Sequence, residues 1–350
     1  MAGTSTGRKT VYNAITSEEK LRRVNEENLQ LEDDFLEYLI STDRANTTIT
    51  QYRAVLHIFW CWNLENNKNK TFVQLTKREI ARFQNNALNV WGWSPRRMRM
   101  AKSVMRSLEN YIINILDEDY PDYKKIWDKI ESPVNEAVRE KSVFTNEELQ
   151  GLLDTLVEKG EYEKACFVAL AMYSGRRKAE LARFKVSYFT DENLICEGAL
   201  YKSPEKMTTK GRGQRGKLLY VYTLAKPFKP YLDLWIEERK KLGIETDWLF
   251  PLYREGRWQD EQASLSTFDS WARSFSKILD KPWYPHSMRH RFVTALSEQG
   301  IPDGVIKDVV GWTDVSLVSV YCDTEAEDSF DNYFGADGIK QNEKRGLKDL

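Results

Sequence analysis

The sequence is poor in the residues that build metal sites and disulfide frameworks. Its 350 residues include only 4 Cys and 3 His. The cysteines are scattered and form no CxxC pair; they are Cys61, Cys166, Cys196 and Cys322. Zinc sites need closely spaced ligands, and small secreted domains need many paired cysteines. The sequence therefore argues against both, and it predicts no metal site.

Long apolar segments are also missing. No run approaches the roughly 20 apolar residues that cross a bilayer. Residues 1–10 lack the apolar core of a secretory signal. We expect a cytoplasmic protein, and its length favours two domains with a core in each.

Neither sign of charge dominates, because 52 Lys and Arg face 53 Asp and Glu. The distribution is uneven all the same. Basic residues gather at 96–102, 176–178 and 202–217, whereas acidic residues gather at 26–37 and in later runs at 117–122 and 323–331. A single charge run is more commonly a solvated face. Together the runs predict one positive face, which would suit a nucleic acid.

The first part of the chain predicts helices. Residues 1–27 are polar, with a helix at 17–28, and we expect a tail or an added helix there. An all-α domain should cover 28–135, with Thr47-Thr48 capping its second helix and Ser94-Pro95 starting its fourth. The fourth helix is strongly basic and carries Arg96, Arg97, Arg99 and Lys102.

A second, α+β domain is expected over 136–335, with a tail at 336–350. Thr145 and Glu148 form a capping-box pattern at its first helix. A buried helix at 165–173 should end at Gly175. The remaining elements are predicted as strands at 194–196, 198–201 and 218–222, a short buried strand or turn at 248–251, and helices at 227–242 and 265–279. The fold class is thus multidomain, mainly α, with a small sheet.

The stretch from 285 to 322 combines residues suited to a phosphodiester. His286 and Arg289 are three apart and share one helix face. A second short helix should end at Gly311, before Trp312, and Tyr321 follows an apolar run. Arg binds two phosphate oxygens, His moves a proton, indole donates a hydrogen bond, and Tyr is a nucleophile.

Each of these residues also has an ordinary structural interpretation. A His and an Arg three apart are more commonly a packed side chain and a surface cation. The chain has 17 Tyr, so Tyr321 by itself could be a core residue. Tyr333 is its rival as nucleophile, although it follows the apolar run in an acidic segment.

In order, the motifs resemble those of the tyrosine recombinases, the family of phage integrases, Xer proteins and Cre. That family has T-G-x-R-x-x-E-L, a hairpin Lys, H-x-L-R-H, G-H or G-W, and a Tyr nine residues later. Here Y-S-G-R-R-K-A-E-L, the basic loop, H-S-M-R-H and G-W occur in turn, and Trp312 and Tyr321 are nine apart. Trp312 stands where many members have His and Cre has Trp. The resemblance covers about 29–335 and includes the family's all-α core-binding domain.

The resemblance implies a two-domain clamp that closes on duplex DNA and performs site-specific recombination, integrating and excising a mobile element or phage. It implies a 3′-phosphotyrosine intermediate that needs neither metal nor ATP. Tyr321 would attack, two arginines would hold the phosphate, and a lysine would protonate the leaving oxygen, with Glu180 in a supporting place. The implied catalytic residues are Arg177, Lys210, His286, Arg289, Trp312 and Tyr321.

Several assignments stay open. Arg176 occupies a position that is usually apolar and competes with Arg177, although the G-x-R register favours Arg177. Lys206 and Lys217 are alternatives to Lys210 because the basic loop is long. The residues expected to contact DNA are Arg96, Arg97, Arg99, Lys102, Arg176 and Arg212.

The implied partners are duplex recombination sites and a homo-tetramer on two sites, with DNA-bending or directionality factors as candidate accessories. Phe330, Tyr333 and Phe334, at helical spacing, are expected to pack on their own domain or on a neighbouring protomer. The alternative functions are a chromosome-dimer resolvase, a telomere-resolving enzyme, a type IB topoisomerase, or a DNA-binding accessory protein that no longer cleaves.

Overall fold

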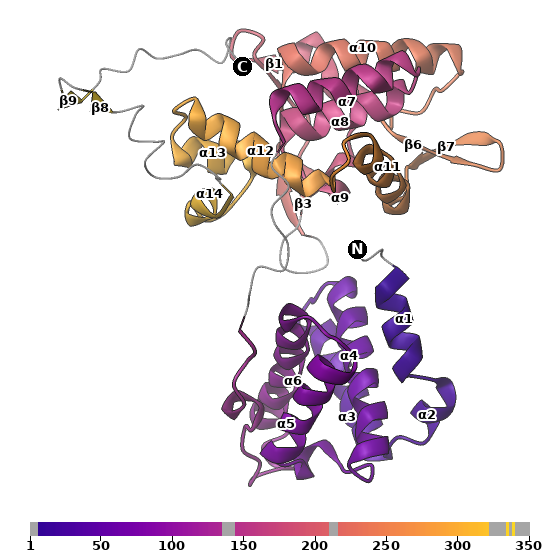
Figure 1. Ribbon diagram of the computed structural model, residues 1–350, viewed down its shortest axis with the longest axis vertical. Coiled ribbons are helices and arrows are strands. Elements are labelled where there is room, and N and C mark those ends of the chain that lie inside the picture. Colours follow the sequence, from indigo (N-terminus) through magenta and orange to yellow (C-terminus); the bar gives the residue numbers. More distant parts are fainter. Residues whose placement is uncertain (1–5, 135–143, 210–215, 322–333, 336–337, 340–350) are drawn as a thin grey trace. The chain divides into compact units, whose positions relative to one another are not determined.

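The computed structural model describes residues 6–134, 144–209, 216–321, 334–335 and 338–339 (Figure 1). The assignments to Lys210, Arg212, Phe330 and Tyr333 lie outside these residues. The chain divides into two compact units, and the main boundary falls between Glu140 and Lys141. No helix in the described part of the chain is long and apolar enough to cross a membrane.

The first unit is built from helices throughout its described residues, as predicted. Its order is α1 (Thr6–Ile15), α2 (Glu18–Arg22), α3 (Glu26–Ser41), α4 (Asn46–Asn66), the 3₁₀ turn η1 (Phe72–Gln74), α5 (Lys77–Asn85), the π-helical η2 (Asn86–Val90), α6 (Pro95–Ile115) and η3 (Trp127–Lys129).

Side-chain caps decide where several of these helices begin. Ser94 accepts a hydrogen bond from the backbone of Arg97 and precedes Pro95, so α6 starts where the sequence predicts. The cap expected at Thr47-Thr48 is wrong, because α4 begins at Asn46 after Ala45, which makes no side-chain cap. The helix expected at 17–28 is two helices, since the Asn25 side chain caps a new one, α3.

An aromatic cluster forms the core of the first unit. The Phe59 ring lies 5.0 Å from that of Phe83 and 5.5 Å from that of Trp127, in edge-to-face contacts. Ile15 of α1 is buried in the same core and Leu21 of α2 packs against it, so both helices pack on α4 as added helices.

The second unit is mixed. Its order is α7 (Asn146–Glu158), α8 (Tyr162–Ser174), α9 (Lys178–Leu181), η4 (Val186–Phe189), η5 (Asp191–Asn193), β1 (Leu194–Ile195), β2 (Leu200–Lys202), β3 (Met207–Thr209), β4 (Lys217–Leu219), β5 (Tyr222–Leu224), α10 (Ala225–Lys241), β6 (Pro251–Arg254), β7 (Arg257–Gln262), α11 (Leu265–Ile278), α12 (Pro285–Glu298), α13 (Asp303–Val310), α14 (Ser316–Tyr321), β8 (Phe334–Gly335) and β9 (Gly338–Ile339).

The strands form short antiparallel sheets. β1, β2 and β5 make one sheet, with Leu200 opposite Leu224, and β3 and β4 make a separate hairpin. The single strand predicted at 218–222 is therefore two strands, because β4 pairs with β3 whereas β5 pairs with β2. The β6–β7 hairpin extends well beyond the short strand or turn predicted at 248–251.

The apolar helix α8 lies at the centre of the unit, against α7, α10 and α12 (Figure 1). Phe167 stacks on Phe268 with ring centroids 4.5 Å apart. A smaller core joins α12, α13 and α14 and includes Phe292, Ile306, Trp312 and Val318. These two cores hold the C-terminal end of α8 and the motifs of the last three helices in place.

Candidate active site

The C-terminal end of α8 is where the site begins. Gly175 ends the helix with φ +58°, a left-handed conformation that glycine adopts without strain. A Cβ at this position would lie 2.4 Å from Cδ1 of Phe292. Glycine therefore allows α12 to pack directly against the turn that carries Arg176 and Arg177.

Arg177 is held by a buried carboxylate. Its Nη1 donates to Oε1 of Glu180 at 3.0 Å, and its backbone N–H donates to Oε2 at 3.3 Å. The Glu180 side chain is 2% exposed and that of Arg177 is 28% exposed. The carboxylate thus fixes a guanidinium that solvent can reach.

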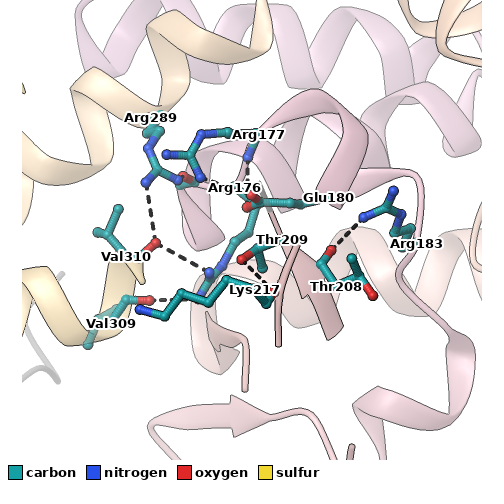
Figure 2. Close-up of polar contacts among 11 residues, drawn as sticks. Arg176, Arg177, Glu180, Arg183, Thr208, Thr209, Lys217, Arg289, Val309 and Val310 are labelled. Carbon is teal, nitrogen blue, oxygen red and sulfur yellow. Dashed lines mark hydrogen bonds and ion pairs between the residues drawn. The ribbon is translucent and has the colours of Figure 1, made fainter. Parts of the chain in front are cut away.

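Arg289 connects three segments of the unit. This buried side chain on α12 donates from Nη1 to the Gly175 carbonyl at 2.9 Å and from Nη2 to the Val310 carbonyl at 3.3 Å. Its guanidinium lies over the ring of Trp312, 5.0 Å from the centroid. Figure 2 shows Arg177 and Arg289 directed into the same part of the site.

Arg176 does not belong to an exposed DNA-contacting surface, contrary to the sequence-based expectation. Its side chain is 0% exposed. It donates from Nη2 to the Val309 carbonyl at 2.6 Å and from Nη1 to the Val310 carbonyl at 3.3 Å (Figure 2). Of the two adjacent arginines, Arg177 is the one that solvent reaches.

The other predicted residues of the 285–322 stretch lie on α12, after α13 and on α14. His286 is exposed, one helical turn before Arg289, with its ring 5.1 Å from that of His290. Trp312 is buried and follows Gly311, which ends α13 with φ +80°. Tyr321 is the last residue of α14, a helix that packs on α12 and α13.

The β3–β4 hairpin and its flanks carry further cations, of which Lys217 lies near the end of α13. Lys210 lies outside the described residues, but Lys217 is half-buried on β4 and extends toward Val309 in Figure 2. Lys206 is exposed, with its ammonium 5.8 Å from the ring centroid of Tyr220. Arg183, which the sequence analysis did not single out, donates to the Thr208 carbonyl at 2.5 Å and so fastens the hairpin beside α9.

The basic helix α6 belongs to the first unit. Arg96 and Arg99 are exposed, and the Arg99 Nε donates to the Pro133 carbonyl at 2.8 Å. The guanidinium of Arg97 lies 4.4 Å from the ring centroid of Trp93. Arg96 and Arg99 are therefore accessible to a partner and Arg97 partly so, and their contact with DNA stays a prediction.

The prediction that Lys102 contacts DNA is wrong. Its side chain is buried, and its ammonium donates to the Ile130 carbonyl and to Ser132 Oγ. Burial, followed by the charge of Arg106, lowers the pKa of Lys102. Its spacing from Met98 and Met105 places it on the apolar face of the helix, and that spacing is visible in the sequence.

Comparisons with known proteins give the family of the chain. A sequence profile of the phage integrase family matches residues 142–328, more than half of the chain. The chain therefore belongs to the phage integrase family and is a tyrosine recombinase.

Two curated relatives cover most of the chain. The SPbeta prophage-derived recombinase-like protein YomM of Bacillus subtilis is 29% identical over 81% of this chain and 82% of its own length. A tyrosine recombinase of Thermosipho africanus is 23% identical over 85% of this chain and 96% of its own length.

Solved structures share the fold. The XerH site-specific recombinase bound to its palindromic difH substrate superposes with a TM-score of 0.60 at 18% identity, covering 90% of both chains. A lambda integrase from a tetramer bound to a Holliday junction superposes with a TM-score of 0.60 at 15% identity, covering 84% of this chain and 76% of that one. The predicted fold class, all-α and α+β units of the tyrosine recombinase type, is confirmed.

Proposed function

We propose that the protein is a site-specific DNA recombinase that cuts and rejoins duplex DNA through a 3′-phosphotyrosine at Tyr321. The observation that carries this is the convergence of Arg177 and Arg289, one fixed by Glu180 and the other by backbone carbonyls. The Arg177 guanidinium is reached by solvent and can bind a non-bridging oxygen of the phosphate, while the buried Arg289 guanidinium lies beside it and adds positive charge. Together they would stabilise the negative charge that accumulates as the phosphate reacts. Trp312 packs under Arg289 and supplies an indole donor to the same region.

The reaction follows from these residues. The Tyr321 hydroxyl gives its proton to His286 as its oxygen attacks phosphorus, the bond to the 5′ oxygen breaks, and that oxygen takes up a proton from a lysine of the hairpin. Lys210 is the proposed acid, with Lys206 and Lys217 as alternatives. His286 assists proton transfer at the tyrosine and the phosphate. Attack by another 5′-hydroxyl then reverses the step and releases Tyr321, so neither a metal nor ATP enters the balance.

The biological role proposed is integration and excision of a phage or other mobile element. The YomM relative is prophage-derived by its name, which favours this role over chromosome-dimer resolution. The proposed partners are two duplex recombination sites bound by four copies of the chain, with accessory DNA-bending or directionality factors as candidates. The enzyme would act where the cell keeps its DNA, in the cytoplasm or nucleoid.

Substitution of Tyr321 by Phe tests the proposal. The variant keeps the ring but lacks the attacking oxygen, so it should bind DNA normally and form no covalent adduct. The probe is a labelled duplex recovered by binding selection from a random-sequence pool, and the measurement is a gel of SDS-denatured protein that still carries label. Tyr333→Phe is the matched control and should form the adduct. Loss of the adduct in Tyr333→Phe alone would move the nucleophile to Tyr333.

A further inference from the structure

The buried guanidinium of Arg176 has no role in the reaction described so far. It is fully buried, although it sits where the resembling family usually has an apolar side chain. Burial lowers its pKa to about 10, which still leaves it charged at neutral pH. Charged groups are buried only where they have polar partners, because desolvation is otherwise costly. The groups that accept hydrogen bonds from Arg176 therefore indicate its role.

Those partners are the last carbonyls of α13. Arg176 reaches the Val309 carbonyl at 2.6 Å and the Val310 carbonyl at 3.3 Å, and Arg289 reaches the Val310 carbonyl at 3.3 Å as well. A helix C-terminus leaves its last carbonyls without intrahelical partners, and they carry partial negative charge. Such an end is electrostatically unfavourable beside a site for an anionic phosphate.

Packing around these carbonyls leaves little freedom. A Cβ at Gly311 would lie 3.2 Å from Nη1 of Arg176 and 2.9 Å from Cδ1 of Leu219 on β4. The guanidinium is therefore enclosed between the end of α13 and the hairpin. Trp312 follows directly and lies under Arg289.

We propose that Arg176 is a positioning residue for DNA cleavage. It neutralises the Val309 and Val310 carbonyls and fixes the end of α13, and through that end it sets Trp312 and Arg289 against the scissile phosphate. This role rests on the proposed function. It predicts that the charge and the planar two-nitrogen geometry of the Arg176 guanidinium affect the rate of DNA cleavage and not the affinity for DNA.

The test compares Arg176→Met with a matched buried arginine of the same unit. Arg239 is also buried and donates to the carbonyls of Thr246, Trp248 and Leu249, at 2.5, 2.9 and 3.1 Å. Both Met variants should lower the thermal midpoint. Only Arg176→Met should slow formation of the covalent adduct, by roughly 10–100-fold, the scale of a small misplacement of catalytic groups. Affinity for the selected duplex should stay that of the wild type.

Two further variants show how Arg176 acts. Arg176→Lys keeps the charge but replaces the planar fork by a single ammonium nitrogen, so it should restore part of the rate. In a Trp312→Phe background the effect of Arg176→Met should shrink, because coupled residues are not additive.

The outcomes are distinguishable. A wild-type protein that forms no adduct on the selected duplex would contradict the proposed function itself. A wild-type protein that cleaves while Arg176→Met cleaves as fast as Arg239→Met would overturn the role of Arg176 alone. If Arg176→Met does not fold, Arg176→Lys is compared with Arg239→Lys instead. Equal rates of adduct formation in these two variants would also overturn the role of Arg176.

Discussion

At the scale of single residues, Glu163 on α8 shows how burial couples stability to pH. Burial raises the pKa of this carboxyl from its usual 4.5 to about 8, although Arg239 and Lys164 oppose the shift. Between these values the folded chain holds a proton that the unfolded chain has lost. The contribution of Glu163 to stability therefore falls as the pH rises from about 4.5 to about 8.

Replacing Glu163 by Gln should remove this dependence, because the amide stays neutral at every pH. The thermal midpoint of Glu163→Gln should exceed that of the wild type by a margin that grows from about pH 5 to about pH 8. Circular dichroism melts across this range measure it. Glu158→Gln removes an exposed carboxylate of α7 and is the control. Parallel curves for the two variants would mean that Glu163 is ionised in the folded protein.

Single residues also show what the sequence can and cannot predict. Arg176 and Arg177 are adjacent cations after the same glycine, and local pattern gives no sign that one is buried. Their difference arises from the carbonyls of α13, more than a hundred residues away in the chain, which take up Arg176. The burial of Lys102, in contrast, could have been predicted from its helical spacing to Met98 and Met105. Charge alone groups it instead with its basic neighbours.

At the scale of elements, α6 provides a test of DNA binding. Arg96, Arg97 and Arg99 replaced together by Gln should weaken binding of the selected duplex. The substitutions should also flatten the dependence of log K on log salt concentration, by about one for each phosphate that the variant no longer binds. The thermal midpoint should change little, because these side chains are at the surface.

Lys102→Met is the matched control on the same helix. It removes a buried donor and leaves carbonyl and hydroxyl oxygens without it, which costs about 1–3 kcal/mol. It should lower the midpoint and leave the salt dependence unchanged. If the triple variant binds with an unaltered salt slope, this face of α6 is merely solvated.

Helices were more predictable than strands for a physical reason. Caps and apolar spacing are local, so α6, α7 and α8 begin or end close to their expected places. β3 pairs with β4 across the basic loop, and three-residue strands carry too few side chains to reveal a pattern. The position of the candidate lysines was therefore hard to predict, because the hairpin that carries them depends on pairing between distant residues and not on local propensity.

At the scale of the whole molecule, the C-terminal segment is where assembly can be tested. Phe330 and Tyr333 lie outside the described residues, while Phe334 is in strand β8, which pairs with β9. The helical spacing expected of the three aromatics is therefore wrong at Phe334. The aromatic residues that follow Tyr321, the proposed nucleophile, still suit contact between protomers.

A chain that ends at residue 329 should bind a single site and form the adduct, yet it should lose recombination between two sites. Gel mobility on one and two sites, together with a plasmid recombination assay, measures this. The control replaces residues 340–350 by a Gly/Ser segment and should recombine. Full recombination by the shortened chain would mean that the segment acts only within its own subunit.

The carbonyl partners of the buried arginines have a consequence for biosynthesis. Arg289 meets the carbonyl of Gly175 across 114 residues, and Arg176 meets that of Val310 across 134. A chain emerging from the ribosome therefore displays its basic helix long before these contacts exist. Domains fold as units and the N-terminal one comes first. If the basic helix binds DNA as proposed, a nascent or interrupted chain should hold DNA before it is able to break it.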